Sequence, residues 1–501
     1  MTREHEVAII GAGPNGLTAA AYLGLSGTDV VVLEQRFERG GTLASDDYST
    51  PFTYNQAQAA LPLGTGNPVV ADLGLASQGV AFIEPEVALE VTAADGDHVI
   101  GRGGAGLGQT VQDMFTSVSR ACTAVLYRSP EPEQSLLARW RSQGEAAAAD
   151  LAGLAPAALA ALADDDPGRL AVRYACAASG FADPGERLGP VGAFMVARWF
   201  APALVAGGSK SLANALFRIA ARAGAACHVS ARVTEVQRAG DAFLMTCADG
   251  RQVHAQNVIC TLDPCTTFTR LLDPAIVPAE LAEAGRRWEF DDLACFTAHF
   301  GIAGLPPVSR HSREPYLRLV GFSGVADLDD RLTAVRSGRL PGKPAGVLSV
   351  TTAHDPLQAS PGPYGPLHTL RFDTFAPVSH PDGSWDRKRR EYRAQCWRFL
   401  CSELPALREA QLIAQFADAP GDLRRRFATT SGGTVRQGAV SPAQALILRP
   451  HPACADTRTP VHGFYLGGGG VHPGVPGLLS AGMLAARALG ADSGLTVAAG
   501  R

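Results

Sequence analysis

Residues 6–34 read EVAIIGAGPNGLTAAAYLGLSGTDVVVLE and predict a strand, a glycine turn, a helix and a second strand. The apolar run Val7–Ile10 is typical of a buried parallel strand. The turn carries G-x-G-x-x-G, whose glycines permit a tight turn, let a pyrophosphate approach the backbone and let the helix pack on the strand. The first helical amides then face the phosphates. The residues predicted to contact them are Gly11, Gly13, Pro14, Asn15 and Gly16.

An acid closes the second predicted strand. Glu34 follows the run DVVVL, and a carboxylate at this point accepts hydrogen bonds from both ribose hydroxyls of an adenosine. It would repel a 2′-phosphate, which argues against NADP. A glycine turn without nucleotide is the alternative, but the strand, the helix and the acid all occur at the right spacing. The segment therefore predicts dinucleotide binding.

Two further glycine clusters favour FAD over NAD. Gly40 and Gly41 follow the second strand, where an NAD domain has no general need for a glycine pair, whereas FAD enzymes use one to let the chain pass close to the cofactor. Residues 463–470, GFYLGGGG, predict a short strand that runs into glycines, before a helix over 478–489. That helix N-terminus suits a second ligand contact. The predicted FAD-contacting residues here are Gln35, Gly40, Gly41, Thr42, Gly469, Gly470, Pro476 and Gly477.

Four motifs carry a resemblance to a known family: GAGPNGLTAAAYL at 11–23, GG at 40–41, GGSKSLANAL at 207–216 and LGGGGVHPG at 466–474. The chain resembles the phytoene-desaturase-like branch of the FAD-dependent amine-oxidase superfamily. It is particularly similar to the group named pyridine-nucleotide-disulfide oxidoreductase domain 2. The similarity covers nearly the whole chain but is thin between about residues 96 and 206. The resemblance implies that Val233 lies beside the adenine and that His472 lies near the isoalloxazine.

The disulfide part of that family name does not suit this chain. The first helix, residues 15–24, has no cysteine, and a redox-active pair is usually found there. Cys260 with Cys265 and Cys396 with Cys401 have C-x4-C spacing, but they fall on a returning strand with its loop and on a charged helix predicted over residues 381–404. We interpret both pairs as incidental.

The predicted fold class is α/β. We expect a Rossmann-type, glutathione-reductase-like FAD-binding domain from residues 1–60, 201–265 and 432–501. Residues 61–200 and 266–431 are expected to form a discontinuous α+β substrate domain on an antiparallel sheet, because residues 316–320 and 369–375 alternate apolar and polar side chains. A further strand of this domain is predicted over residues 294–300. GRGGAGLG at 101–108 lacks the following strand and acid, so it predicts no second nucleotide site.

Composition limits the class of protein. A chain of 501 residues suggests two domains, and the net charge of −4 without a long basic block argues against nucleic-acid binding. Ten cysteines without regular spacing suggest reduced thiols in a cytoplasmic protein. No leader, membrane-spanning run or metal site is predicted. Peripheral membrane contact stays open because residues 190–205 are markedly apolar and predict either a buried helix or the wall of a channel. The preference for arginine over lysine is typical of a GC-rich bacterium.

Candidate site residues follow from the motifs. His472 is the candidate catalytic residue, since a histidine with a pKa near 6.5 exchanges protons at working pH; the alternative is that it bonds a backbone carbonyl and shapes the loop. Candidates for the substrate site follow the glycine pair: Tyr48, Phe52, Tyr54 and Asn55, with ordinary core packing as the alternative for Phe52 and Tyr54. Arg371, like Arg318, is a candidate anchor for an anionic substrate group or a residue of a solvated sheet face.

The predicted function is an FAD-dependent oxidoreductase that desaturates an apolar or amphipathic small molecule, with oxygen or a quinone as the electron acceptor. The first alternative is an amine or amino-acid oxidase of the same fold. The second is a flavin-dependent isomerase without net redox change, and the third is a flavoprotein whose role is interaction. Oligomeric state does not follow from the sequence.

Overall fold

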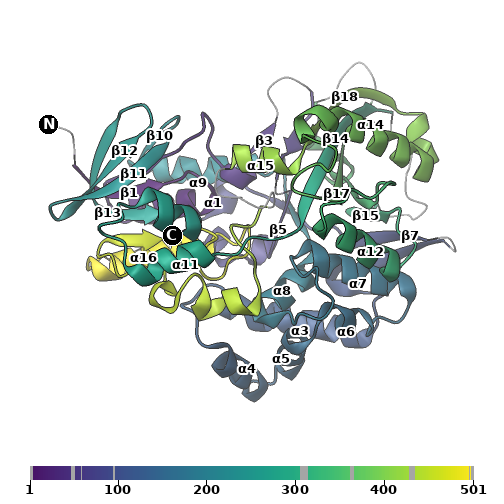
Figure 1. The fold of residues 1–501 in the computed structure, drawn as a ribbon, viewed down its shortest axis with the longest axis horizontal. Coiled ribbons are helices and arrows are strands. Elements are labelled where there is room, and N and C mark those ends of the chain that lie inside the picture. The colour runs from purple at the N-terminus through teal and green to yellow at the C-terminus, as the bar shows by residue number, and fades with distance from the viewer. Residues whose placement is uncertain are drawn as a thin grey trace.

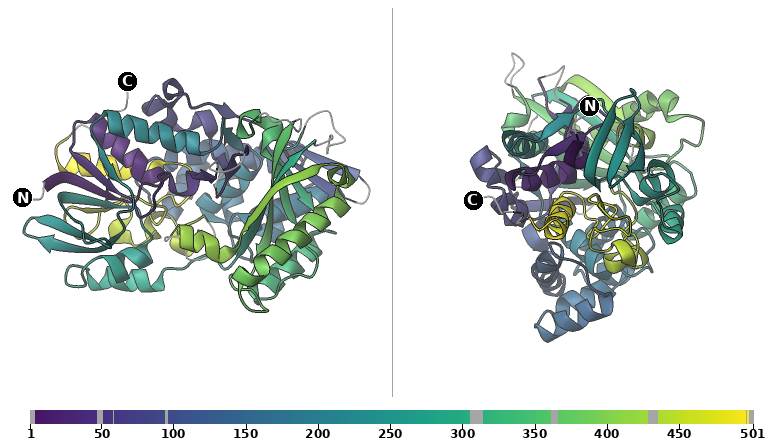
Figure 2. Two further views of the ribbon diagram at one scale, coloured as in Figure 1. Left: turned by 90° about the horizontal axis from the view of Figure 1, so that it is seen from above. Right: turned by 90° about the vertical axis from the view of Figure 1, so that its left-hand side faces the viewer.

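The protein consists of two seven-stranded sheets joined by a layer of helices (Figure 1). The computed structural model describes residues 4–46, 51–57, 59–93, 96–304, 314–360, 366–427, 435–495 and 497. The candidate Tyr48 lies outside the described residues. Viewed from above, the first sheet occupies the N-terminal end of the long axis and the second sheet the opposite end (Figure 2).

The first sheet has the order β10-β2-β1-β13-β12-β11. The strand β19 also pairs with β13, at residues 258–260, beyond the part of β13 that pairs with β12. All pairs among β10, β2, β1, β13 and β19 are parallel, whereas β12 and β11 add an antiparallel hairpin. Its strands are β1 (Glu4–Ile10), β2 (Val30–Leu33), β10 (Ala226–His228), β11 (Val233–Ala239), β12 (Ala242–Cys247), β13 (Gln252–Cys260) and β19 (Phe464–Leu466). These strands come from three separate parts of the chain that the sequence assigned to the FAD domain.

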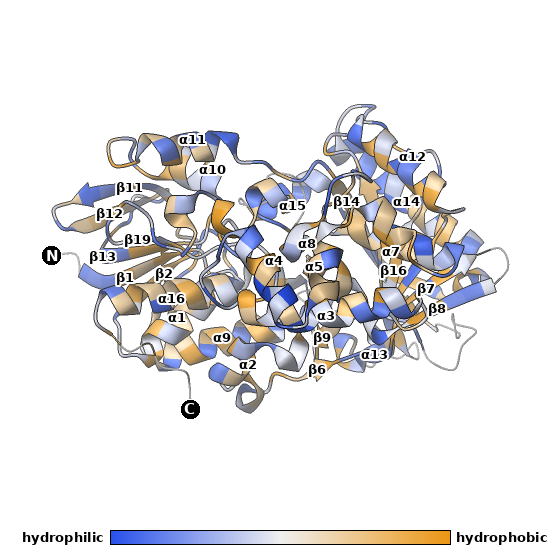
Figure 3. Cartoon of the chain, turned by 90° about the horizontal axis from the view of Figure 1, so that it is seen from below, coloured by the Kyte–Doolittle hydropathy of each residue, from blue (hydrophilic) through white to orange (hydrophobic). Residues whose placement is uncertain are grey.

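Helices cover this sheet because its central strands are apolar on both faces. β2 is buried at all four residues, as is typical of a parallel strand between two layers. The helix α1 (Pro14–Leu25) packs against α9 (Lys210–Arg222) and α16 (Ser480–Asp492). In Figure 3 the hydropathy colours show apolar strands around β2 and β19, and more polar residues on the outlying β11, whose side chains are largely exposed or half-buried.

The second sheet has the order β18-β14-β17-β16-β15-β7-β8 and is antiparallel except between β15 and β7. One face packs against α14 (Trp385–Glu403) through Phe296, Phe300 and Phe372. We call the opposite face, which carries Thr297, His299 and Arg371, the inner face. The strands are β7 (Val87–Ala93), β8 (Gly96–Gly101), β14 (Ala294–Ala303), β15 (Leu317–Val320), β16 (Gly346–Val350), β17 (Leu367–Ala376) and β18 (Gln411–Asp418).

A helical layer lies beneath both sheets in Figure 1 and shares one core with α1, α9 and α16. The helices of this layer are α3 (Gln109–Val125), α4 (Glu133–Ser142), α5 (Ala146–Gly153), α6 (Pro156–Ala160), α7 (Asp166–Ala178) and α8 (Gly189–Trp199). The other helices and strands are α2 (Pro68–Asp72), α10 (Pro264–Thr266), α11 (Ala279–Arg287), α12 (Val325–Arg336), α13 (Thr351–His354), α15 (Pro420–Arg426), β3 (Ser45–Asp46), β4 (Tyr54–Asn55), β5 (Ala60–Leu61), β6 (Phe82–Ile83) and β9 (Ala203–Val205).

Several predicted elements are shifted for local reasons. Helix α14 begins at Trp385 and not near residue 381, because the Ser384 side chain accepts a hydrogen bond from the Asp386 amide and so caps the helix. Helix α16 begins at Ser480, two residues later than predicted, because Leu479 has a φ of +65°. The apolar stretch 190–205 divides into α8 and β9, and α8 is buried from Gly189 to Ala197, so it is a helix of the interior and not an exposed apolar surface.

No helix within the described ranges combines the length and the apolar character needed to cross a bilayer. The ten cysteines are all unpaired thiols, including both C-x4-C pairs. Cys260 and Cys396 are buried, and burial raises the pKa of each thiol, to about 11 and about 12. These surroundings agree with the interpretation that neither pair is redox-active.

Candidate functional site

The first glycine turn forms an open cradle at the edge of the first sheet. Gly11 has a φ of +101°, and a Cβ there would collide with the Thr261 hydroxyl. A Cβ on Gly16 would collide with the Gly11 carbonyl, so this glycine holds α1 tightly against β1. By contrast, a Cβ on Gly13 would meet nothing within 4 Å. The space in front of Gly13 is therefore the place where a ligand can approach the backbone.

Glu34 is fixed beside this cradle. Its Oε2 accepts a hydrogen bond from the Ala12 amide at 2.7 Å and its Oε1 accepts one from the Arg36 amide at 2.9 Å. The side chain is 6 % exposed; burial raises the pKa of Glu34, while the hydrogen bonds from the backbone act in the opposite direction. Each carboxylate oxygen keeps a second lone pair, so both can accept from ribose hydroxyls without giving up the internal bonds.

The glycine pair closes over the first turn. Gly40 and Gly41 have φ values of +110° and +52°, and a Cβ on Gly41 would lie 2.9 Å from the Gly13 Cα. The Gly40 amide donates to the Ala12 carbonyl at 2.9 Å. The two glycine motifs, which a whole helix and strand separate along the chain, thus meet at one edge of the sheet. Gln35 and Thr42 are half-buried on either side of this pair.

Three more of the predicted cofactor residues lie near the same edge of the sheet. Asn15 accepts a hydrogen bond from the Gly482 amide at 3.3 Å, which ties the start of α1 to α16. Pro14 is the first residue of α1, where its missing N–H costs nothing. Val233 begins β11 at the site of a β-bulge and is 9 % exposed. Ala231 precedes this strand, and its amide donates to the Glu34 carbonyl at 2.7 Å. Val233 therefore follows within two residues of a contact with Glu34.

The C-terminal glycines form a loop between β19 and α16, which we call the C-terminal loop (residues 467–479). A Cβ on Gly470 would collide with Pro264, and Gly477 has a φ of +79°. The Leu478 carbonyl near the end of the loop accepts hydrogen bonds from the Asn67 amide group and the Tyr127 hydroxyl, both at 3.0 Å. Pro476 is half-buried next to these contacts. The loop is thus held by residues from three other parts of the chain.

His472 lies inside this loop with no exposed surface. Its Nε2 is 3.2 Å from the Val125 carbonyl oxygen. Burial lowers the pKa of His472 to about 4, and the positive charge of Arg449 lowers it further, against the opposing effect of the carbonyl. The ring is therefore neutral at working pH. These surroundings favour the alternative of a loop-shaping histidine over proton transfer.

Arg449 is a residue of this region that the sequence did not single out. It is fully buried, and its guanidinium donates to the carbonyls of Gly438, Ala439, Gln444 and Gly469. The only signal in the sequence is the segment RPHPACADTRTP, which matches the approach to the last family motif. A buried arginine that serves main-chain carbonyls cannot be recognised without the loops that supply them.

Three of the predicted substrate residues, Tyr54, Asn55 and Arg371, line one cavity on the inner face of the second sheet. The cavity is small, with space for about one water-sized molecule. Tyr54 is 3 % exposed, and its hydroxyl has no hydrogen-bond partner within the described residues. Arg371 forms an ion pair with Asp373 at 2.8 Å and donates to the carbonyls of Asn55 and Ala57. The lining residues are Thr53, Tyr54, Asn55, Ala59, His299, Thr351, Thr369, Leu370 and Arg371.

Asn55 connects this cavity to the GGS motif at residues 207–209. Its Oδ1 accepts from both the amide and the hydroxyl of Ser209 at 2.9 Å, and its Nδ2 donates to the Gln358 side chain at 2.9 Å. The Gly207 amide donates to Asp355 at 2.7 Å. The Asn55 side chain is thus engaged within the protein, and its backbone carbonyl is held by Arg371. Its surroundings favour a role in shaping the cavity.

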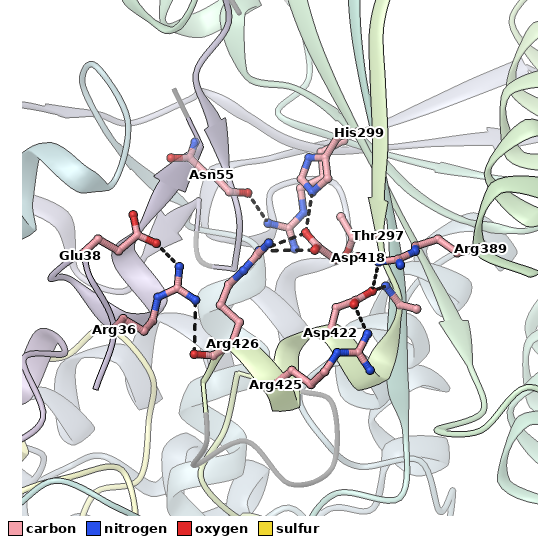
Figure 4. A network of polar contacts seen from close by, with 12 residues as sticks. Arg36, Glu38, Asn55, Thr297, His299, Arg389, Asp418, Asp422, Arg425 and Arg426 are labelled. Atoms are coloured by element: carbon pink, nitrogen blue, oxygen red, sulfur yellow. Dashed lines mark hydrogen bonds and ion pairs between the residues drawn. The ribbon is translucent and has the colours of Figure 1, made fainter. Parts of the chain in front are cut away.

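Figure 4 shows a chain of polar contacts from the nucleotide edge to the cavity. Arg36 pairs with Glu38 and donates to the Arg426 carbonyl at 3.5 Å. Arg426 in turn lies 3.3 Å from Asp418, whose other oxygen is 3.5 Å from His299 Nε2. Burial lowers the pKa of His299, so its ring is neutral at working pH despite the nearby carboxylate.

Aromatic side chains cover a second part of the inner face. Tyr174 of α7 packs against Trp199, Phe322 and Phe375, with ring centroids 5.3–5.8 Å apart. Cys295 lies nearby, and burial with the Asp373 charge raises the pKa of its thiol to about 12. These residues form an apolar cluster farther along the same face of the sheet.

Comparison with known proteins gives the family. The family model for flavin containing amine oxidoreductases matches residues 15–304, more than half of the chain. The chain belongs to this family. It is an FAD-dependent oxidoreductase, and the open cradle at Gly13, the oriented Glu34 carboxylate and the close passage of Gly41 fit that cofactor.

Individual relatives differ in how much they share. One of the limonene dehydrogenase subunits of Castellaniella defragrans is 24% identical over 99% of this chain and 96% of its own length. The mouse pyridine nucleotide-disulfide oxidoreductase domain-containing protein 2 is 27% identical over 54% of this chain and 48% of its own. Putrescine oxidase with bound putrescine has a similar structure, with a TM-score of 0.60 at 17% identity over 99% of this chain and 100% of its own. Cyclohexylamine oxidase from Brevibacterium oxydans also has a TM-score of 0.60, at 16% identity over 98% and 100%.

Proposed function

We propose that this FAD-dependent oxidoreductase removes a hydride from a C–H bond of an apolar or amphipathic small molecule. The substrate lies between the C-terminal loop and the inner face of the second sheet. Two hydrogens leave neighbouring carbons, one as a hydride and one as a proton to solvent, and a double bond forms between those carbons. Oxygen or a quinone accepts the electrons afterwards.

The observation that carries this proposal is the charge balance at the cavity. Arg371 is neutralised by Asp373, and Asp418 lies beside Arg426. His299 is neutral because burial lowers its pKa. An ammonium or carboxylate group on a substrate would find no unbalanced charge among these residues, whereas a neutral molecule would lose nothing on entry. The apolar cluster around Tyr174 supports the same class of substrate.

The sequence left Arg371 as either an anchor for an anionic group or a residue of a solvated sheet face, and we propose a third role for it. Arg371 holds the carbonyls of Asn55 and Ala57 and so fixes the wall of the cavity. Arg318 likewise forms an ion pair with Glu90 at 2.7 Å, and the side chains of Arg318 and Glu90 are almost fully buried. A buried, paired arginine shapes a site, but it attracts an anion only weakly because its charge is already compensated.

The cofactor, when bound, accepts the hydride; the residues of the chain position the reactants, and a water molecule takes the proton. Gly13, Gly41 and Glu34 hold the adenosine and pyrophosphate side. The C-terminal loop supplies main-chain groups on the flavin side, with His472 neutral and fixed to the Val125 carbonyl. Tyr54 offers its hydroxyl to a polar group of an amphipathic substrate. None of these roles needs an acid or base with a pKa near neutrality.

A relative that aligns with nearly the whole chain supports a dehydrogenase. The limonene dehydrogenase subunit aligns with 99% of this chain, and its name describes dehydrogenation of a neutral compound. An amine oxidase is the second candidate, because the family model and the similar structures of putrescine and cyclohexylamine oxidases fit it equally well. A cage of aromatic residues around a neutral amine would use the same apolar cluster.

Anaerobic reduction distinguishes these functions. The purified holoprotein is mixed under nitrogen with monoterpene hydrocarbons, terpene alcohols, linear diamines and cyclic amines in turn, and the visible flavin absorption is followed. We expect bleaching by a neutral compound, with a product that mass spectrometry finds two hydrogens lighter. Bleaching by amines alone, with hydrogen peroxide on re-aeration, would replace the proposal with the amine oxidase. A product of unchanged mass would indicate an isomerase.

A further inference from the structure

Arg449 is a buried cation whose hydrogen bonds all go to main-chain carbonyls. Nε and Nη2 donate to the Gly469 carbonyl at 3.0 and 2.7 Å, and Nη1 donates to the Ala439 and Gln444 carbonyls at 2.7 and 3.0 Å. The guanidinium lies over the Trp288 ring, 5.0 Å from its centroid. A cation without exposed surface is costly unless something compensates its charge. The carbonyls and the ring compensate it only in part.

The nearest opposite charge is already engaged. Asp291 pairs with Arg436 at 2.9 Å, and this pair is itself almost fully buried. The group of Arg449, Arg436 and Asp291 therefore carries a net charge of about +1. His472 adds no charge, because burial lowers its pKa to about 4. Burial also lowers the pKa of Arg449, to about 9, which still leaves it protonated at neutral pH. Arg449 is thus the source of an excess positive charge beneath the C-terminal loop.

The same guanidinium sets the orientation of the loop. Because a peptide unit is planar and trans, the Gly469 carbonyl and the Gly470 N–H point in opposite directions. Two hydrogen bonds from Arg449 hold the carbonyl inward, so the amide is held on the opposite face of the loop. A Cβ on Gly474 would collide with the guanidinium, so the loop is shaped around this side chain.

We propose that Arg449 is a positioning residue for the flavin. It fixes the Gly469–Gly470 peptide and places a buried positive charge beneath the C-terminal loop, which would hold the flavin. Such a charge would favour the reduced flavin, which carries a negative charge on its pyrimidine ring. Charge near that ring is one of the means by which a protein adjusts the electron affinity of a flavin. The inference rests on FAD binding alone and does not depend on which substrate the enzyme oxidises.

The test compares Arg449→Met, Arg449→Lys and Arg173→Met as holoproteins. Arg173 is the matched control, because it is also buried and donates to two main-chain carbonyls, those of Phe181 and Ala182, but lies on α7. The readouts are the two-electron midpoint potential and the dissociation constant of sulfite, which adds to flavin and leaves a negative charge. Neither readout needs a substrate, so failure of the proposed function leaves this test intact.

We expect Arg449→Met to weaken sulfite binding at least tenfold. A tenfold change in the reduction equilibrium corresponds to about 30 mV for a two-electron couple, so the midpoint potential should fall by about that amount. Arg449→Lys keeps the charge and should stay near the wild-type potential, but it cannot satisfy four carbonyls and should bind FAD more weakly. Arg173→Met should lose stability without a change in potential. If Arg449→Met does not hold FAD, the lysine variant decides: a potential lower than that of the wild type by about 30 mV or more would refute the role of the charge. Wild-type sulfite affinity in Arg449→Met would refute it as well.

Discussion

Replacing Gly13 by alanine should separate cofactor binding from folding. Gly13 has ordinary extended backbone angles, φ −75° and ψ −176°, and a Cβ there meets nothing within 4 Å. Loss of backbone entropy in the unfolded chain stabilises such a variant by about 0.4–1 kcal/mol, and the poorer N-cap offsets a similar amount. The free energy of unfolding of the apoprotein should therefore change by less than about 1 kcal/mol.

The effect on FAD should be much larger. The new methyl group fills the space through which the pyrophosphate approaches the N–H groups at the start of α1. Each hydrogen bond to a charged group contributes about 1.5–3 kcal/mol, so the loss of even one bond corresponds to that amount. This is roughly a 10- to 150-fold increase in the dissociation constant of FAD.

Deflavinated protein, titrated with FAD and unfolded in urea, provides both measurements. Gly66→Ala is the matched control, because a Cβ on Gly66 also meets nothing within 4 Å but lies away from the cradle. Gly16→Ala is the opposite control, since its Cβ collides with the Gly11 carbonyl and should destabilise the apoprotein itself. A Gly13→Ala variant that binds FAD with about the wild-type affinity would refute the assignment of this cradle to the pyrophosphate.

Three other substitutions probe the site. Glu34→Gln should weaken FAD binding about tenfold or more, because a ribose hydroxyl loses a charged acceptor, and titration of the apoprotein with FAD measures it; unchanged affinity would count against the ribose contact. His472→Gln should make the free energy of unfolding less dependent on pH in the acid range. Because the folded pKa of about 4 lies below the unfolded value of 6.5, the wild type loses stability as pH falls from about 6.5 to 4, by about 3 kcal/mol in total, and urea unfolding across that range should give a flatter profile for the variant. Tyr54→Phe should leave the apoprotein as stable as wild type or slightly more so, since the buried hydroxyl has no partner within the described residues, while the apparent KM for an amphipathic substrate rises severalfold; a loss of stability above about 1 kcal/mol would reveal a hidden partner.

Features that are local in sequence were predictable. The strand, glycine turn, helix and second strand of residues 6–34 occur as β1, α1 and β2, because their hydrophobic pattern and glycine spacing act over a few residues. The strands at 294–300, 316–320 and 369–375 were also predicted, and they lie in the second sheet as β14, β15 and β17. Boundaries were less accurate where a single cap or a positive φ decides them, as at Ser384 and Leu479.

The candidate site was predictable only in part, because side-chain chemistry depends on neighbours from distant parts of the chain. The sequence could not show that Arg371 is paired with Asp373 and holds the carbonyl of Asn55, 316 residues away. It could not show that His472 is neutral, since its low pKa comes from burial in a loop that Val125 and Arg449 help to enclose.

The sequence by itself determined the family, the cofactor and the first nucleotide turn, because glycines with special backbone requirements and a terminal acid leave a pattern that is read locally. Only the tertiary structure decided which charges are compensated. It brought Tyr54, His299 and Arg371 to one cavity and surrounded Arg449 with four carbonyls. The physical reason is that burial and ion pairing depend on residues from distant parts of the chain that meet only in the folded protein, so no short stretch of sequence shows them.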